Sequence, residues 1–293
     1  MTRIWKCAGL RWDRGGPVLW WEGGVGSGLE WGKRVAFRVV EGSARRCAGA
    51  RGNACPVGAV VAGRSVGARC EQCARLERAH SVAADTVADD PRPYRVYLAW
   101  FGPGLSKVGI TAVERGSARL LEQGAVCFSW LGVGPLMAAR RAEELLRAAL
   151  GVPDRIPYAD KRAVRAALPP TEAERAAEPA ELHARAVTLD GWPESLEVQP
   201  FRPVDHVAAF GLAAAPPAGA EVTELVPGGE VGGKLVAAAG PDLHLDTGGG
   251  GGVVVLDTRL MRGWDLVTAA GEEVSVPVRR LRGADEHEQH RLF

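Results

Sequence analysis

Four cysteines lie close together in the chain, and their spacing is typical of a metal site. They are Cys47, Cys55, Cys70 and Cys73. Cys70 and Cys73 form a CxxC pair, whose turn lets two thiolates converge on one ion, and a second pair completes a tetrahedron. The first pair is spaced more widely, so we expect a loop between its members. Because the segment is rich in Gly, Pro and Arg and cannot form a core alone, we predict a structural zinc ion.

Other roles for the cysteines remain open at this point. A redox CxxC is disfavoured because no βαβ pattern surrounds it, and an iron–sulfur or inert role is the remaining alternative. Disulfides are not expected in a chain predicted to be cytoplasmic. Cys7 and Cys127 stand in apolar surroundings, so we expect them to be small buried hydrophobic residues.

Four polar residues in the middle of the chain, Tyr97, Lys107, Arg119 and Glu143, are of types that could do chemistry. Each residue also has an ordinary alternative: the tyrosine can simply pack within a strand, and the glutamate can be a solvated helix residue.

Two strands and a helix must position these side chains. Residues 94–102 and 105–111 are rich in β-branched and aromatic residues and are separated by Gly-Pro-Gly, which predicts a hairpin. Strand alternation then places Lys107 and Gly109 on the same face. Residues 136–150 are predicted to form a helix that closes this unit.

The helical pattern of residues 136–150 distinguishes two neighbouring glutamates. Its apolar stripe consists of Ala142, Leu145, Leu146, Ala149 and Leu150. Glu143 lies at the edge of the stripe, whereas Glu144 lies nearly opposite and can pair with Arg140 or Arg147. A metal ligand that faces the sheet is better placed at the edge, so Glu143 is the preferred carboxylate and Glu144 the alternative.

These segments resemble the GIY-YIG nuclease superfamily. The resemblance rests on Val96-Tyr97, on Lys107-Val108-Gly109-Ile110-Thr111, on a following arginine and on Ala142-Glu143-Glu144-Leu145-Leu146. In that superfamily two strands carry the GIY and YIG motifs, a following helix carries an arginine, and a later helix carries a metal-binding glutamate. The chain is more similar to the DUF2797 family, a family without a settled activity. That similarity covers most of the chain, centres on residues 96–125 and extends to Ala159-Asp160-Lys161 and Gly232-Gly233-Lys234.

The superfamily resemblance implies a role for each candidate. Tyr97 matches the tyrosine of GIY, whose phenol lies at the water or the phosphate. Lys107 stands where YIG has its tyrosine, a departure that removes one phenol and leaves a cation. Arg119 matches the arginine that holds the phosphate, with Arg115 as the alternative. The metal-binding glutamate falls at Glu143 or Glu144, and Mg²⁺ or Mn²⁺ would bind at the preferred Glu143.

Nucleic acid is the partner that this resemblance implies. The basic residues expected to bind it are Lys107, Arg115, Arg119, Lys161 and Arg162, the last two because they form a basic pair able to reach a backbone phosphate. The net charge of +1 does not by itself indicate such a partner. The local charge is uneven, because residues 44–80 contain seven arginines against two glutamates.

The sequence predicts an α+β fold with three structural regions. Residues 1–80 are expected to form a β region with the zinc cluster, and residues 94–168 are expected to form a GIY-YIG-like α/β unit. Residues 169–190 are expected to form a helical connector with Thr171 as its N-cap. Residues 191–293 are expected to form a small β barrel or sandwich with a polar tail. Apolar runs are too short to span a bilayer and the N-terminus lacks the apolar region of a signal peptide, so we expect a cytoplasmic protein without a membrane partner.

Three functions from different classes fit these observations. The first is a zinc-stabilised nucleic-acid-binding protein in which cleavage is weak or lost. The second is an active divalent-metal-dependent nuclease that uses Tyr97, Arg119 and Glu143. The third is an enzyme or binder of a small anionic ligand that reuses the fold. The missing second tyrosine favours the first over the second, and the near-neutral net charge keeps the third open. The sequence predicts no oligomeric state.

Overall fold

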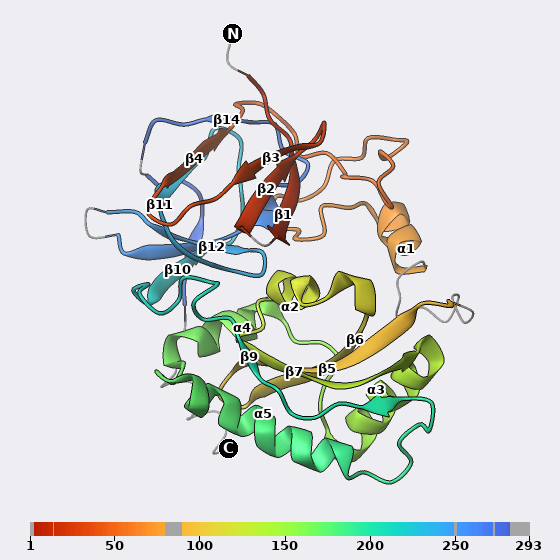
Figure 1. The fold of residues 1–293 in the computed structure, drawn as a ribbon. Helices are drawn as coiled ribbons and strands as arrows, with labels where there is room; N and C mark the ends of the chain where they lie inside the picture. The colour runs from red at the N-terminus through yellow and green to blue at the C-terminus, as the bar shows by residue number, and fades with distance from the viewer. Residues whose placement is uncertain (1–2, 14, 80–89, 249–250, 272, 282–293) are drawn as a thin grey trace, which may run out of the picture. The chain divides into compact units, whose positions relative to one another are not determined.

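The computed structural model describes residues 3–13, 15–79, 90–248, 251–271 and 273–281. It is a mixed α+β structure that divides into two compact units (Figure 1). Unit 1 combines Met1–Thr86 with Ala214–Leu281, and unit 2 combines Val87–Ala213 with Arg282–Phe293. The N-terminal and C-terminal β regions, which the sequence presented separately, therefore belong to the same unit. The predicted polar tail lies outside the described residues.

Unit 1 contains two sheets. A three-stranded antiparallel sheet has the order β1-β2-β3, and its strands are Cys7–Asp13, Gly16–Trp21 and Val25–Gly28. A seven-stranded sheet has the order β14-β4-β11-β12-β13-β10-β15. Its strands in chain order are β4 (Arg34–Val39), β10 (Ala218–Val222), β11 (Glu230–Ala239), β12 (Asp242–Asp246), β13 (Val253–Asp257), β14 (Leu266–Thr268) and β15 (Val278–Arg280). A 3-10 turn, η3, covers Thr258–Met261.

The seven-stranded sheet joins distant parts of the chain. Strand β4 pairs antiparallel with β11 on one side and with β14 on the other. The indole Nε1 of Trp12 in β1 donates to the carbonyl of Gly240, 2.9 Å away, and thereby ties the small sheet to the large one. The C-terminal region was predicted to be a small barrel or sandwich, and the barrel is wrong, because the described strands form an open sheet that includes β4 from the N-terminal region.

Close contact between β11 and β12 requires a glycine. A Cβ atom at Gly233 would lie 2.9 Å from the carbonyl oxygen of Asp246 and 3.0 Å from the Cβ of Leu245. Both distances are shorter than ordinary van der Waals contacts. The Gly232-Gly233-Lys234 stretch is therefore explained by strand packing.

The cysteine segment follows β4 and contains little regular structure. Its helix is α1 (Glu71–Ala79), which begins immediately after Cys70. Cys7 and Cys127 are buried, as predicted.

Unit 2 is built on an antiparallel sheet of order β6-β5-β7-β8, and a further short strand, β9, also pairs with β7. The strands are β5 (Pro93–Gly102), β6 (Leu105–Ala112), β7 (Cys127–Pro135), β8 (Glu197–Val198) and β9 (Val204–Asp205). The helices are α2 (Ala118–Gln123), α3 (Leu136–Leu150), α4 (Tyr158–Val164) and α5 (Glu172–Val187), with 3-10 turns η1 (Val113–Arg115) and η2 (Arg165–Ala167). The predicted hairpin and the predicted helix 136–150 are both confirmed.

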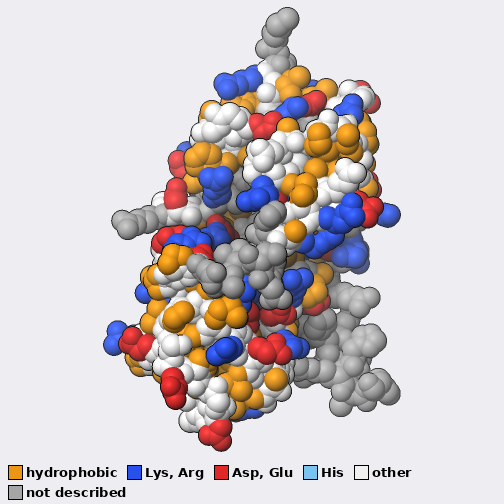
Figure 2. All heavy atoms as spheres, turned by 90° about the vertical axis from the view of Figure 1, so that its right-hand side faces the viewer, with side chains coloured by type: hydrophobic (Ala, Val, Ile, Leu, Met, Phe, Trp, Pro, Cys, Tyr) orange, Lys and Arg blue, Asp and Glu red, His pale blue; other side chains and the backbone are white. Residues whose placement is uncertain are grey.

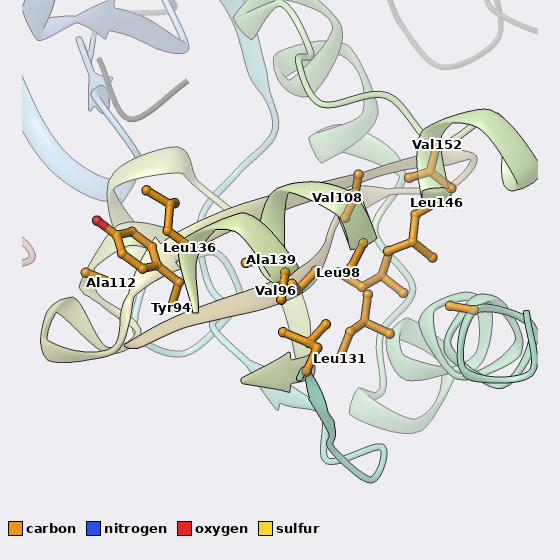
Figure 3. Packing of buried hydrophobic residues seen from close by; sticks show 14 residues of the cluster. Tyr94, Val96, Leu98, Val108, Ala112, Leu131, Leu136, Ala139, Leu146 and Val152 are labelled. Carbon is orange, nitrogen blue, oxygen red and sulfur yellow. The ribbon is translucent and has the colours of Figure 1, made fainter. Parts of the chain in front are cut away.

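The central strand β5 is buried on both faces because helices cover each side. Its residues Val96 and Leu98 pack in a core with Leu136, Ala139 and Leu146 of α3 (Figure 3). The alternate residues of β5 form a second core, whose buried members are Tyr97, Ala99, Phe101, Leu120, Ala125 and Phe128. Because side chains alternate along a strand, the two faces of β5 carry different residues, and the candidate Tyr97 lies on the face covered by α2.

The helix α5 begins at the predicted N-cap. Thr171 accepts a hydrogen bond from the N–H of Glu174 at 3.2 Å, and the Glu174 carboxylate accepts from the N–H of Thr171 at 3.1 Å, which completes a capping box. Its residue Arg175 forms a buried ion pair with Asp205 of β9 at 2.6 Å. Every helix in the described ranges is too short or too polar to cross a membrane.

Candidate functional site

The four cysteines of unit 1 converge as their spacing predicted. The Sγ atoms of Cys47, Cys55, Cys70 and Cys73 all lie within 4.8 Å of one another. A tetrahedral zinc site with Zn–S bonds of ~2.3 Å has sulfur–sulfur edges of ~3.8 Å, and the Cys55 and Cys70 sulfurs are 4.0 Å apart. The cluster therefore has the donor type, number and size of a structural metal site.

Backbone N–H groups point at these sulfurs. The N–H groups of Gly49 and Cys70 donate to the Cys47 sulfur at 3.4 and 3.2 Å. Backbone N–H groups of Ala59 and Val57 lower the pKa of Cys55 to about 6. Such bonds stabilise thiolates, which are the form that binds a metal.

Cys73 behaves differently in the absence of a cation. Burial, together with the neighbouring thiols, raises the pKa of Cys73 to about 12. Four thiolates cannot share such a small volume without a compensating positive charge. A divalent cation among them would supply that charge and favour the deprotonated form of all four.

A buried arginine fixes the loop beside this cluster. Arg45 is 1% exposed, and its guanidinium donates to five backbone carbonyls at 2.7–3.0 Å. Three of the carbonyls belong to Ala62, Gly63 and Ser65, and two belong to Arg259 and Arg262. The sequence analysis missed this residue. Its position two residues before Cys47 was the one available signal, and residue type alone does not distinguish a buried arginine from an exposed one.

In unit 2, Tyr97 lies against a glycine of the neighbouring strand. Tyr97 and Gly109 are cross-strand partners, and a Cβ atom at Gly109 would lie 2.3 Å from the phenol oxygen. The phenol is 2% exposed and accepts a hydrogen bond from Gln123 Nε2 at 2.8 Å. Burial raises the pKa of Tyr97, so the phenol is protonated at neutral pH.

Lys107 lies on the same face of the sheet, two residues before Gly109. Its ammonium is 5.7 Å from the centre of the Tyr97 ring and donates to the carbonyl of Asp154 at 2.8 Å. The residue is 8% exposed. Burial and, to a smaller extent, the nearby Arg119 lower the pKa of Lys107 to about 8, while Glu143 acts in the opposite direction.

The arginines of the α2 region differ in how strongly they are paired. Arg115 forms a 2.6 Å ion pair with Glu122. Arg119 lies 3.8 Å from the same carboxylate, and its side chain remains 42% exposed. Because Arg119 also influences the pKa of both Tyr97 and Lys107, it is the better placed of the two to act with them.

The two glutamates of α3 occupy the environments that helix geometry indicated. Glu144 is exposed and forms an ion pair with Arg147. Glu143 is half-buried, and burial raises its pKa, while the positive charge of Lys107 opposes that rise. Within the described part of the chain, Glu143 makes no hydrogen bond or ion pair. Arg119 of α2 and Glu143 of α3 thus both influence the pKa of Tyr97 in β5 and that of Lys107 in β6.

The expectation that Lys161 contacts a phosphate does not fit its environment. Lys161 is 3% exposed, and its ammonium lies 3.9 Å from the centre of the Phe101 ring and 4.3 Å from that of Tyr158. It donates to the carbonyl of Gln123 at 3.0 Å, at the C-terminal end of α2. The lysine is thus an internal support of that helix. Its neighbour Arg162 is half-buried.

Gln123 is the polar residue that connects these groups, and sequence reasoning did not select it. Its side chain donates to the phenol of Tyr97, and its backbone carbonyl accepts from Lys161. The residue is 6% exposed. A buried glutamine at a helix end has no distinctive sequence pattern, so only its place in the Glu122-Gln123-Gly124 stretch could have drawn notice.

Comparisons with known proteins place the chain in a family. A family model described as "Protein of unknown function (DUF2797)" matches residues 32–266. The chain belongs to the DUF2797 family. The match spans both units of this DUF2797 protein and includes the cysteine cluster and the residues around Tyr97. Searches of curated proteins and of solved structures found no significant match.

Proposed function

We propose that this DUF2797 protein binds nucleic acid, and that Tyr97, Lys107, Arg119 and Glu143 form the site that receives a backbone phosphate. The observation that carries the proposal is the convergence of a phenol, two cations and a carboxylate from four separate elements of unit 2. We further propose that zinc occupies the cluster of Cys47, Cys55, Cys70 and Cys73 and has a structural role.

The order of elements supports a relationship to the GIY-YIG superfamily. Two strands carry Tyr97 and Gly109, the following helix α2 carries Arg119, and the later helix α3 carries Glu143. This is the order of motifs that the superfamily resemblance implies. The cation of Lys107, in place of the second tyrosine, favours phosphate binding over efficient cleavage, because the phenol of the YIG motif is missing.

Each residue has a task that fits its environment. Arg119 is partly exposed and weakly paired, so its guanidinium is available for two charge-assisted hydrogen bonds to a phosphate. The Tyr97 hydroxyl accepts from Gln123, which leaves its own hydrogen to donate. Lys107 adds positive charge 5.7 Å from the centre of the Tyr97 ring.

A divalent-metal-dependent nuclease is the second candidate, and the environment of Glu143 favours it. A half-buried carboxylate without a hydrogen bond or ion pair to the described residues is a suitable ligand for Mg²⁺ or Mn²⁺. A metal there would lower the pKa of Glu143 and help to polarise a phosphate oxygen.

A binding titration at two salt concentrations tests the proposal. Because each phosphate contact releases counterions, affinity for an oligonucleotide should fall with salt, and Lys107→Ala or Arg119→Ala should reduce the salt slope by about one unit each. Arg185→Ala removes an exposed arginine from α5 of the same unit and should change the slope little. Affinity should also decrease as the pH rises through about 8, where Lys107 loses its charge.

Glu143→Gln separates binding from cleavage. The variant should retain binding under either function, and it should abolish Mg²⁺-dependent cleavage if the wild-type protein is a nuclease. Absence of nucleic-acid binding even at low salt would exclude both functions. That result would leave a small anionic ligand as the remaining interpretation.

A further inference from the structure

The outer surface of the cysteine segment carries five exposed arginines, and we propose that it is a second nucleic-acid-binding surface. We name it the arginine face, and its members are Arg46, Arg51, Arg64, Arg75 and Arg78. The inference rests on the proposed function in its choice of ligand, but its residues belong to unit 1, whereas the phosphate site belongs to unit 2.

Contacts within unit 1 account for three of the seven arginines in residues 44–80. Arg45 is buried and holds five carbonyls. Arg69 donates to the carbonyl of Gly49 at 2.9 Å and forms a 2.9 Å ion pair with Glu77, and Arg46 donates to the carbonyl of Gly58 at 3.0 Å. These three explain how the segment is held together, so the other four exposed arginines require another reason.

Acidic residues do not neutralise the arginine face. Glu77 is already engaged by Arg69 and by the N–H of Arg51, which leaves Glu71 as the other glutamate of the segment. Among the residues that the structure describes, the side chains of Arg51, Arg64, Arg75 and Arg78 make no hydrogen bond or ion pair. Unpaired like charges repel one another, and a bound polyanion would relieve that repulsion.

Helix geometry brings part of the arginine face together. Arg75 and Arg78 are three residues apart on α1, on the side opposite the buried Cys73. Arg51 lies beside the same helix but next to Glu77, which is nearer to the side of Cys73, because the Arg51 N–H donates to the Glu77 carboxylate at 2.9 Å. Figure 2 looks at the side of unit 1 that carries α1, and Lys and Arg side chains gather there.

The composition of the surface favours nucleic acid over other polyanions. The segment uses arginine without any lysine, and the planar guanidinium binds phosphate through two parallel hydrogen bonds. Exposed aliphatic side chains accompany the arginines, since Val57, Val60 and Leu76 are 70%, 63% and 53% exposed. Nucleic acid offers both partners, with phosphates for the guanidiniums and apolar base and sugar surfaces for the aliphatic groups.

Two double variants and one control test the arginine face. Anisotropy of a labelled oligonucleotide of about 20 nucleotides would be measured at about 50 and about 200 mM salt with the full-length protein. The first double variant combines Arg75→Gln with Arg78→Gln, and the second combines Arg51→Gln with Arg64→Gln. Each should raise the Kd roughly tenfold and lower the salt slope by up to ~1.8. Arg38→Gln with Arg280→Gln removes two exposed arginines from strands of the same unit and should have little effect.

Each outcome distinguishes this inference from the phosphate site of unit 2. If both double variants kept the Kd and the salt slope of the wild type while Lys107→Ala lost affinity as expected, the arginine face would be overturned and the phosphate site of unit 2 would not. An equal loss of affinity in the control variant would show that any exposed arginine contributes through its charge, which would overturn the arginine face. Binding of phosphatidylserine vesicles without binding of the oligonucleotide would assign the surface to a lipid instead. Thermal unfolding and metal content equal to those of the wild type establish that each variant is folded.

Discussion

Gln123 joins two other buried polar groups into one chain of hydrogen bonds. Lys161 donates to the carbonyl of Gln123, and the Gln123 side chain donates to the phenol of Tyr97. The end of α2 is therefore held in place, and Arg119, one turn earlier in the helix, lowers the pKa of the same phenol. A lysine without access to the outside can in this way support the phosphate site that we propose.

Replacement of Lys161 by methionine measures this support. Methionine keeps the apolar contacts with Phe101 and Tyr158 but leaves the carbonyl of Gln123 without its donor. An unsatisfied buried polar group costs ~1–3 kcal/mol, so Lys161→Met should lower the free energy of unfolding by about that amount. Urea denaturation provides the measurement. Arg155→Met, at a side chain that is 81% exposed, should change the value by less than ~0.5 kcal/mol, and an equal effect of both would contradict the role of Lys161.

The raised pKa of Glu143 predicts how stability varies with pH. A carboxyl group whose pKa is higher in the folded state contributes stability at low pH, which is lost as the pH rises above 4.5 through the folded-state pKa. Glu143→Gln removes this dependence. The variant should therefore be more stable relative to wild type at pH 7 than at pH 4, by less than ~1 kcal/mol, as thermal unfolding at the two pH values would reveal. A difference of opposite sign would mean that a cation stabilises the carboxylate.

For single residues, sequence reasoning is limited because it rarely shows in which direction a side chain points. Glu143 was separated from Glu144 because helical periodicity determines which side of α3 a residue occupies. Lys161 was misplaced because a basic pair on a short helix does not reveal which member points inward. Gln123 and Arg45 were missed because their hydrogen-bond partners are far away in the chain, Tyr97 and Lys161 for Gln123 and carbonyls such as that of Arg259 for Arg45.

At the scale of elements, the contact between β5 and β6 depends on one glycine. The phenol of Tyr97 occupies the space that a side chain at Gly109 would need, at 2.3 Å from a Cβ atom. Gly109→Ala should lower the free energy of unfolding by ~1–3 kcal/mol, because the ring must leave its position. Adding Tyr97→Leu should recover part of the loss. Additive effects of the two substitutions in urea titrations would exclude this steric explanation.

The cysteine segment is the element whose stability we expect to depend on metal. Elemental analysis of protein never exposed to chelator should find one zinc per chain, and Cys70→Ser should abolish it. Because the energy of structural zinc binding is local folding energy, amide exchange should then accelerate over residues 47–79 and remain slow in β5 and β7. Cys127→Ser, outside the cluster, should retain the metal. Less than about half an equivalent of zinc in the wild type would contradict the proposal.

Locally encoded elements were predictable, and pairing between distant segments was not. The hairpin of β5 and β6, the helix α3 and the Thr171 cap each depend on residues close together in the chain. The sequence around β4 does not indicate which strands pair with it, because the alternation of apolar and polar residues along a strand does not identify the partner strand. This explains why the N-terminal and C-terminal β regions were expected to be separate.

For the whole molecule, the division into two units predicts different behaviour of two fragments. Residues 87–213 contain the sheet of β5, β6 and β7 with its helices and both of its cores, so this fragment should unfold cooperatively by itself. Residues 1–86 should not, because both strands that pair with β4 lie beyond residue 213. Circular dichroism during thermal unfolding would compare the two fragments. A cooperative transition in residues 1–86 would show that β4 needs neither partner.

The pairing of β4 with β11 also has a consequence for biosynthesis. At a translation rate of ~5–20 residues per second, β4 leaves the ribosome roughly 10–40 s before β11 exists to receive it. During that interval unit 2 is able to complete its folding, while Phe37 and Val39 of β4 remain exposed to solvent and to other nascent chains. Arg34 and Arg38 alternate with these apolar residues, and charges placed in this way oppose intermolecular strand pairing. We therefore expect the two arginines to oppose intermolecular pairing of β4 until β11 has been synthesised.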